Sequence, residues 1–288
     1  MITQRMMTGR RGGGMVWDSV LLEGQPGPLL NPDATRVRDY AAYQHVSLVG
    51  VSLPKVTQIG FRAFYSCLTL ADASFPACQS IGEQAFAGCF ALGSASFPAC
   101  EIIWMAAFRD CRALVCASFP ACGEMMASAF QYCSALEAAY FPVLSSAVAV
   151  TAFDGCSMLR VFSAPLAIGI NQAAFRSCSL LPAAIFPACI DVSAFAFQRC
   201  AALSIASFPA AMVLGTSAFY GCTALESLYL LGDSVVSIAN TSVFGQTPMS
   251  VSTYLGYYGS IFVPESLYAA YIAASYWSLY SDRIVSVA

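Results

Sequence analysis

The sequence repeats with a period of 22 residues through most of its length. Eight phenylalanines stand at intervals of 22 residues, with one interval of 23, each within the pattern A-F-x-x-C-x-x-L: Phe64, Phe86, Phe108, Phe130, Phe153, Phe175, Phe197 and Phe219. A fixed period of this length indicates a solenoid, in which each unit is one coil that stacks on the next. A chain built this way buries its apolar residues by stacking coils, because one coil alone cannot cover its own apolar face.

Further positions of the repeat are equally regular. Five residues before each of these phenylalanines the residue is apolar: Ile59, Ile81, Ile103, Met125, Val148, Ile170, Val192 and Leu214. Eleven residues after it comes a Phe-Pro pair in six copies, and the exceptions are Ala164-Pro165 and Leu230-Leu231. Nine positions of each unit are apolar in most copies. They are the apolar residue before the pattern, the Ala, Phe, Cys and Leu of the pattern, the residue two before the Phe-Pro pair, the Phe-Pro pair itself, and the residue three after its phenylalanine. We expect all nine to face the core.

A degenerate ninth copy precedes these eight, with Val37, Ala42, His45, Leu48 and Leu53-Pro54 at the equivalent positions. His45, the single histidine of the chain, takes the position that cysteine fills in every later copy. We therefore interpret His45 as a substitution near the end of the solenoid rather than as a catalytic or metal-binding residue.

The combined pattern, S-I-G-x-x-A-F-x-x-C-x-x-L-x-x-x-x-F-P, is clearest from Ser80 to Phe86. It resembles the BspA-like (Treponema-type) leucine-rich repeats, over residues 37 to 237. The resemblance implies an α/β repeat solenoid, a right-handed leucine-rich-repeat coil of about nine units with a parallel β-sheet on one face and terminal caps. It also implies a role like that of the surface adhesins of bacteria and host-associated microbes.

Alternation within each unit predicts a short strand. At Ala73, Ser74 and Phe75 the small and aromatic residues face inward and the serine faces outward. We divide the chain into an N-terminal tail and cap (1–36), the leucine-rich-repeat solenoid (37–237) and a C-terminal cap (238–288). In the last part, Pro264 suits the start of a short helix with Leu267, Tyr271 and Ala274 on one side.

The composition is apolar, with 58% hydrophobic and 10% charged residues. Its longest uncharged runs are broken by proline and glycine, so we expect no membrane insertion. Because no apolar segment follows the basic N-terminal residues, we expect no secretory signal, and hence cytoplasmic synthesis with display on a particle or cell surface. The net charge of −3 argues against a nucleic-acid binder.

The thirteen cysteines follow the repeat. Eight fill the A-F-x-x-C position, four follow the strand, and only Cys116 stands elsewhere. Because a zinc-type C-x-x-C pair is absent and buried thiols behave as small apolar groups, we predict free structural thiols. Cys116, at an outward strand position, is the one we expect to react. We predict no cofactor, no metal and no enzymatic activity, since no nucleophile, phosphate-binding or paired-carboxylate motif occurs.

The positions that vary between copies carry the functional hypothesis. An outward row of serines interrupted by tyrosine and isoleucine is typical of a contact surface. The residues that we single out are Ser74, Ser96, Trp104, Ser118, Tyr140, Ser163, Ile185, Phe195, Ser207 and Tyr229. Unselected drift at unconstrained positions is the plain alternative.

Two classes of function remain open from the sequence. The first is a binding or adhesion protein that presents this variable surface to a protein or glycan, as a cell-surface protein or a phage-type receptor-binding protein does. The second is an intracellular structural or assembly scaffold, attached to a larger assembly through the N-terminal segment, where Arg10-Arg11-Gly12-Gly13-Gly14 reads as a hinge.

Overall fold

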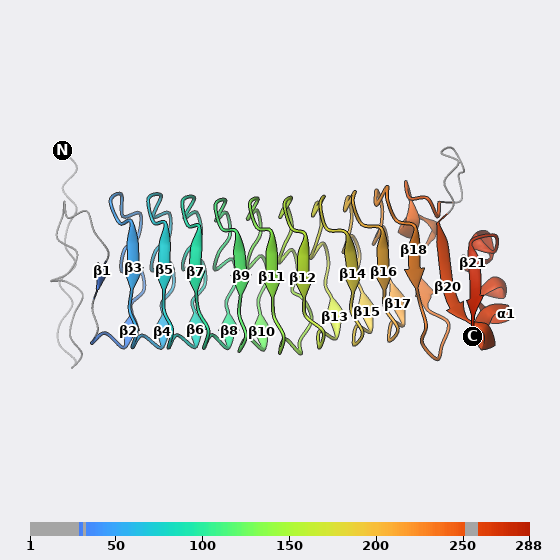
Figure 1. Cartoon of the computed structure of the whole chain (residues 1–288), viewed down its shortest axis with the longest axis horizontal. Coiled ribbons are helices and arrows are strands. Elements are labelled where there is room, and N and C mark those ends of the chain that lie inside the picture. Colours follow the sequence, from blue (N-terminus) through green and yellow to red (C-terminus); the bar gives the residue numbers. More distant parts are fainter. Residues whose placement is uncertain (1–28, 31–32, 251–258) are drawn as a thin grey trace.

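The computed structural model describes residues 29–30, 33–250 and 259–288. These residues form one stack of coils that runs along the long axis of Figure 1, from β1 to the helical C-terminal end. Most of the predicted N-terminal cap, including the Arg10–Gly14 hinge, lies outside the described residues.

Each coil contributes one three-residue strand to a row of parallel strands, hydrogen-bonded as three successive sheets, that we call the strand face. The described part of the chain has nine of them: β3 (Gly50–Ser52), β5 (Asp72–Ser74), β7 (Ser94–Ser96), β9 (Cys116–Ser118), β11 (Ala138–Tyr140), β12 (Val161–Ser163), β14 (Ala183–Ile185), β16 (Ile205–Ser207) and β18 (Ser227–Tyr229). Paired residues are one repeat apart, as Ala73 and Ala95 are. The parallel pairing at this spacing confirms the predicted repeat solenoid.

The strand face continues beyond these nine strands at both ends. A short strand, β1 (Leu29–Leu30), pairs with β3, and β20 (Ser260–Pro264) followed by β21 (Ile284–Val287) extends the sheet after β18. Sheet pairing therefore runs into segments that we assigned to caps, and the proposed domain limits stay a prediction.

A second parallel sheet, absent from our sequence-based expectation of a sheet on one face, runs along the solenoid. It consists of two-residue strands: β2 (Arg36–Val37), β4 (Gln58–Ile59), β6 (Ser80–Ile81), β8 (Ile102–Ile103), β10 (Glu124–Met125), β13 (Gly169–Ile170), β15 (Asp191–Val192), β17 (Val213–Leu214) and β19 (Ser237–Ile238). In seven of these strands, from β4 to β17, the second residue is the buried apolar residue five positions before the phenylalanine. Val37 of β2 and Ile238 of β19 are buried at the matching positions of the two end coils. Two residues are too few to show an alternation in sequence, so the pattern predicts the buried residue but not the strand.

The one 23-residue interval interrupts this second sheet. The extra residue falls between Leu144 and Val148, where the chain needs four steps instead of three to reach the next apolar position. There the sheet is reduced to one isolated bridge, between Val148 and Ile170. The strand face continues past the same coil, because β11 pairs with both β9 and β12.

Two ladders of phenylalanine rings fill the core. Rings of the A-F-x-x-C position stack on their neighbours at 5.0–5.9 Å between centroids, from Phe64 to Phe244. Rings of the Phe-Pro position form the second ladder and contact the first ladder edge-on or tilted. Burial of each ring contributes roughly 1.5–3 kcal/mol, so these ladders supply much of the cohesion between coils.

One of the nine positions that we assigned to the core is wrong. The prolines of the Phe-Pro pairs are exposed in nearly every coil, whereas the phenylalanines before them are buried. Proline lacks a backbone N–H and cannot extend the sheet pairing, so it ends the strand at the surface. Its regular occurrence reflects backbone geometry rather than burial.

The A-F-x-x-C turns hold two residues with left-handed backbone in each full copy. One stands two positions before the phenylalanine and the other two positions after it, as at Ala173 (φ 55°) and Ser177 (φ 62°). Glycine fills the second position in three copies, at Gly88, Gly155 and Gly221. Other residue types adopt this conformation at a cost, so stacking with the neighbouring coils enforces it.

The C-terminal end of the core is closed by short helices, η2 (Thr241–Phe244), η3 (Glu265–Leu267), α1 (Tyr268–Ala273) and η4 (Trp277–Tyr280). The Phe244 ring continues the phenylalanine ladder and contacts the rings of Trp277 and Tyr280. The Nε1 atom of Trp277 donates to the Val236 carbonyl at 2.6 Å. Pro264 ends β20, and the helical segment follows it directly, with Tyr271 buried as expected.

Candidate binding surface

The outward residues of the strand face form a row along the whole sheet. The third residue of each strand aligns with its counterpart one coil away, as Tyr140 does with Ser118 and Ser163. The structure thus brings together eight of the ten predicted surface residues: Ser74, Ser96, Ser118, Tyr140, Ser163, Ile185, Ser207 and Tyr229. Their contribution to binding stays a prediction.

These eight residues differ in how far they can reach a partner. Ile185 is 63% exposed and Tyr140 is 40% exposed. Tyr229 is partly buried and less exposed than Tyr140, because its ring stacks on Phe262 of β20 at 4.6 Å between centroids. We therefore assign Tyr229 partly to the packing of the C-terminal strands.

The remaining two predicted residues lie apart from this row. Trp104 directly follows β8 in the second sheet, is 45% exposed, and donates from Nε1 to the Ser80 hydroxyl at 3.1 Å. Phe195 is half-buried and has a left-handed backbone (φ 61°) in the turn after β15. Sequence spacing alone could not separate them from the strand face, because it does not say which side of a coil a turn residue occupies.

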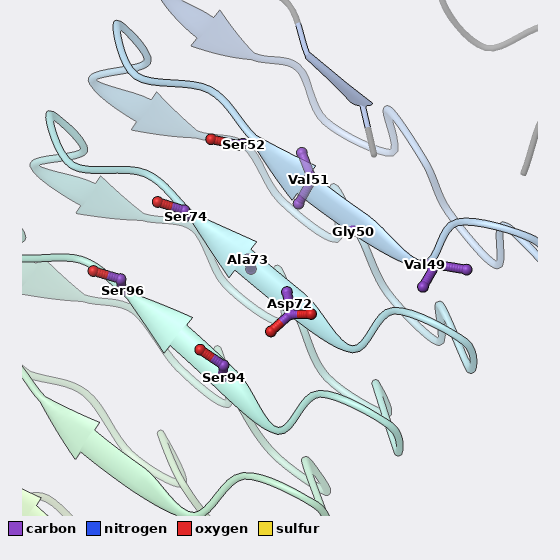
Figure 2. A pocket seen from close by; sticks show the side chains of 9 residues that line it. All are labelled: Val49, Gly50, Val51, Ser52, Asp72, Ala73, Ser74, Ser94 and Ser96. Carbon is purple, nitrogen blue, oxygen red and sulfur yellow. The ribbon is translucent and has the colours of Figure 1, made fainter. Parts of the chain in front are cut away.

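The N-terminal part of the strand face is hollow and carries a row of hydroxyl groups. A depression of about 640 Å³ lies over β3, β5 and β7, where Gly50 has no side chain and its neighbours are mostly small. In Figure 2 the hydroxyls of Ser52, Ser74 and Ser96 line up across three strands, with the Asp72 carboxylate beside them.

The C-terminal half of the same face exposes aliphatic side chains among its serines. Val161, Ile185 and Ile205 are exposed at outward strand positions, where the first coils hold aspartate or serine. The face changes in character along the solenoid while the fold beneath it stays the same.

A second exposed apolar row escaped the sequence analysis. Ile168, Ile190 and Met212 stand two residues before the buried apolar position of the second sheet in consecutive coils. Their backbones are joined by hydrogen bonds of 2.8 Å, and all three side chains are about half-exposed. The signal was present in sequence, since earlier coils carry Thr57, Gln79 and Glu101 at this position.

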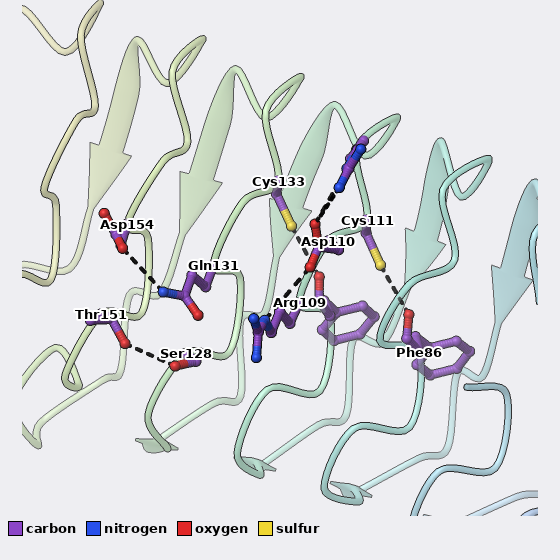
Figure 3. A network of polar contacts seen from close by, with 11 residues as sticks. Phe86, Arg109, Asp110, Cys111, Ser128, Gln131, Cys133, Thr151 and Asp154 are labelled. Atoms are coloured by element: carbon purple, nitrogen blue, oxygen red, sulfur yellow. Dashed lines mark hydrogen bonds and ion pairs between the residues drawn. The ribbon is translucent and has the colours of Figure 1, made fainter. Parts of the chain in front are cut away.

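The cysteines of the A-F-x-x-C position are hydrogen-bond donors as well as core residues. Each donates its thiol proton to a backbone carbonyl in the preceding coil, as Cys111 does to Phe86 at 3.2 Å (Figure 3). The same bond recurs in every full copy at 2.9–3.2 Å. Cysteine thus combines a small apolar side chain with a weak second donor for a carbonyl that already accepts a backbone hydrogen bond within its own turn.

Burial makes most of these thiols poor nucleophiles. Desolvation raises the pKa of Cys78, Cys122 and Cys189 to about 12, and raises the pKa of Cys111 and Cys178 further. At Cys67 the direction reverses, because its interaction with the neighbouring Cys89 thiol lowers its pKa. The thiols are free in the structure, and Cys116 alone among the thirteen is exposed.

One buried carboxylate is held by a polar network across three coils. Asp154, 2% exposed, accepts two hydrogen bonds from Arg176, at 2.9 and 2.6 Å. Gln131 donates to the same carboxylate at 3.1 Å (Figure 3). All three side chains occupy the position after the core phenylalanine, so the network is a side-chain ladder that fixes the turns rather than a reactive site.

The described residues contain no group of three or more histidine, cysteine, aspartate or glutamate side chains arranged to hold a metal ion. Of the helices in the described ranges, none has the length and hydrophobicity needed to span a bilayer.

Several solved structures of leucine-rich-repeat proteins are similar to this chain. A Treponema pallidum leucine-rich-repeat protein is 25% identical, with a TM-score of 0.46, and the match covers 72% of this chain and 75% of that one. A Bacteroides ovatus leucine-rich-repeat protein is 17% identical, with a TM-score of 0.41 and coverage of 89% and 88%. A Listeria monocytogenes internalin is 7% identical, with a TM-score of 0.43 and coverage of 77% and 61%.

These TM-scores lie below 0.5, so the family assignment rests on the repeats themselves. No curated protein matches the chain. The family described as BspA type Leucine rich repeat region, with six copies of its unit, matches residues 35–160 and 151–255. That match spans most of the chain, and the chain therefore belongs to the BspA type leucine-rich-repeat family.

Proposed function

We propose that this chain is a non-enzymatic binding protein that presents its strand face to a protein partner, as an adhesin or receptor-binding protein does. The observation that carries the proposal is the set of large side chains exposed at outward positions of the strand face from β11 onward, led by Tyr140 and Ile185, which are exposed by 40% and 63%. Exposed apolar side chains that cluster on a rigid surface commonly mark contact sites.

The repeat itself supports a selected surface rather than drift. Serine is compatible with the fold at the Tyr140 and Ile185 positions, because five full copies and the degenerate copy hold it there. A soluble solenoid gains nothing in stability from an isoleucine that faces water. Aromatic and aliphatic side chains at such positions suit the desolvated centre of a protein interface.

The test is cell binding by the purified chain and by a Tyr140→Ser/Ile185→Ser variant, measured by flow cytometry on bacterial and epithelial cells. Both substitutions restore the residue that other copies use, so the variant should fold. We expect the wild type to bind one cell type saturably and the double variant to bind at least about tenfold more weakly, the loss expected for a contact centre. Leu166→Ser, which removes an equally exposed apolar side chain elsewhere (49% exposed), should bind as the wild type does.

Equal binding by the double variant and the wild type would contradict the proposal. Absence of cell binding, together with recovery of the chain in a defined intracellular assembly, would instead favour the scaffold function.

A further inference from the structure

A cavity at the turn edge of the solenoid gathers an unusual share of the positive charge of the chain. It has a volume of about 310 Å³ and lies among the A-F-x-x-C turns of three consecutive coils. Its polar lining consists of Arg62, Ser66, Gln84, Arg109, Asp110 and Arg112. The volume is at the lower end of the range of small-ligand sites.

Charge is the first observation that points to a ligand. Three of the thirteen basic residues converge on this cavity and face a single carboxylate, whereas the chain as a whole carries a net charge of −3. Like charges held together are unfavourable unless an anion relieves them. The cavity is therefore an electropositive spot on an otherwise acidic molecule.

The second observation is the number of donors left over. Arg62 uses Nε to donate to the Gln84 side chain at 2.7 Å, and Arg112 uses Nε and one Nη to donate to Asp110 at 3.3 and 2.9 Å. Arg109 approaches Asp110 only at 3.6 Å. Since a guanidinium has five N–H groups, most donors of the three side chains have no acceptor among the described residues.

The third observation is that aromatic rings hold these guanidinium groups in place. Arg62 lies over the rings of Phe61 and Tyr65, at 4.9 and 5.3 Å from their centroids. Arg112 lies 4.6 Å from the Phe90 ring centroid and Arg109 lies 5.9 Å from that of Tyr132. Stacked arginines lose less side-chain freedom when they bind an anion than freely moving ones do.

The repeat does not require these residues. At the position of Arg109 the following coils hold Gln131 and Asp154, and at the position of Arg112 they hold Ser134 and Ser157. The same turn forms in each case, so the arginine cluster is a local addition to the fold.

We propose that this cavity binds an acidic sugar, that is, a monosaccharide unit carrying a carboxylate or a sulfate. The planar forks of the arginines match either oxyanion. The Asp110 carboxylate and the Gln84 amide oxygen are acceptors for the neighbouring hydroxyls of the same ring. Asp110 and the negative net charge disfavour a polyanion such as nucleic acid, and an acidic peptide has no hydroxyl-rich ring for these acceptors.

The experiment is isothermal titration calorimetry of the full chain with two acidic sugars. Glucuronic acid tests the carboxylate and N-acetylglucosamine 6-sulfate tests the sulfate. N-acetylglucosamine and inorganic sulfate serve as the neutral-sugar and anion-only controls. We expect at least one acidic sugar to bind at least about tenfold more tightly than both controls, with affinity that falls as salt rises. Arg109→Gln, which removes the least engaged guanidinium, should weaken that binding about tenfold or more.

Arg160→Gln, an exposed arginine outside the cavity, is the matched control and should leave affinity unchanged. The proposal is overturned if neither acidic sugar binds saturably. It is also overturned if inorganic sulfate binds as tightly as the acidic sugars, or if Arg160→Gln weakens binding as much as Arg109→Gln does. Because Tyr140→Ser/Ile185→Ser leaves this cavity intact, its sugar binding should match the wild type, and the two proposals can fail separately.

Discussion

At the scale of single residues, the repeat tolerates an exchange of side chains that keeps the core filled. Two full copies lack the Phe-Pro phenylalanine, and one of them has Phe162 and Ala164 where most copies have alanine first and phenylalanine second. The Phe162 ring lies 4.7 Å from Phe175 and 5.0 Å from Phe153, between ring centroids. One phenylalanine thus occupies the core from either of two inward positions of the strand.

We expect Phe162→Ala to lower the free energy of unfolding by about 2–4 kcal/mol, because it leaves a gap between two stacked coils. Phe162→Ala/Ala164→Phe should recover most of that loss, since it restores the order of the other copies. Ala164→Phe alone overfills the core and should also destabilise. Urea unfolding of the four proteins measures the cycle, and a double variant no more stable than Phe162→Ala would contradict the exchange.

At the scale of the element, the A-F-x-x-C turn is defined by its left-handed residues. Sequence analysis identified the buried alanine, phenylalanine and cysteine of the turn but not its backbone. Only three of eight full copies place glycine two positions after the phenylalanine, so composition gives a weak signal for a conformation that every one of them adopts.

We expect reciprocal substitutions at this position to have opposite effects. Ser177→Gly relieves a left-handed serine (φ 62°) and should raise the free energy of unfolding by about 1 kcal/mol. Gly221→Ala should lower it by about 1 kcal/mol through backbone strain alone, because a Cβ there would lie 3.5 Å or more from its neighbours. Chemical denaturation measures both, and changes of the same sign would show that the backbone conformation is not the determinant.

At the scale of the whole molecule, the buried thiols act together on stability at alkaline pH. Unfolded thiols lose their protons near pH 8.5–9, whereas Cys78, Cys122 and Cys189 keep theirs until about pH 12 when folded. Over this window the unfolded chain binds fewer protons than the folded chain. The free energy of unfolding must therefore fall as pH rises from about 9 to about 12.

Each such thiol should contribute a slope of about 1.4 kcal/mol per pH unit within that window. Cys78→Ala should have a lower free energy of unfolding at pH 8, because it loses a buried group. Its free energy of unfolding should then fall less steeply with pH than that of the wild type, by the slope that one thiol contributes. Denaturant titrations at successive pH values under reducing conditions measure both slopes. Parallel declines in the variant and the wild type would mean that Cys78 already ionises in the folded state.

The sequence by itself determined the period, the repeat solenoid, the inward phenylalanines and cysteines, and the exposure of Cys116. These follow from spacing, because stacked coils place equivalent positions in register and each must be apolar to be buried. Only the tertiary structure decided the second sheet, the surface position of the prolines, the thiol-to-carbonyl bonds and the grouping of Arg62, Arg109 and Arg112. Those features depend on which neighbouring coil a side chain or backbone group meets, and one-dimensional spacing does not say on which side of a coil a turn residue lies.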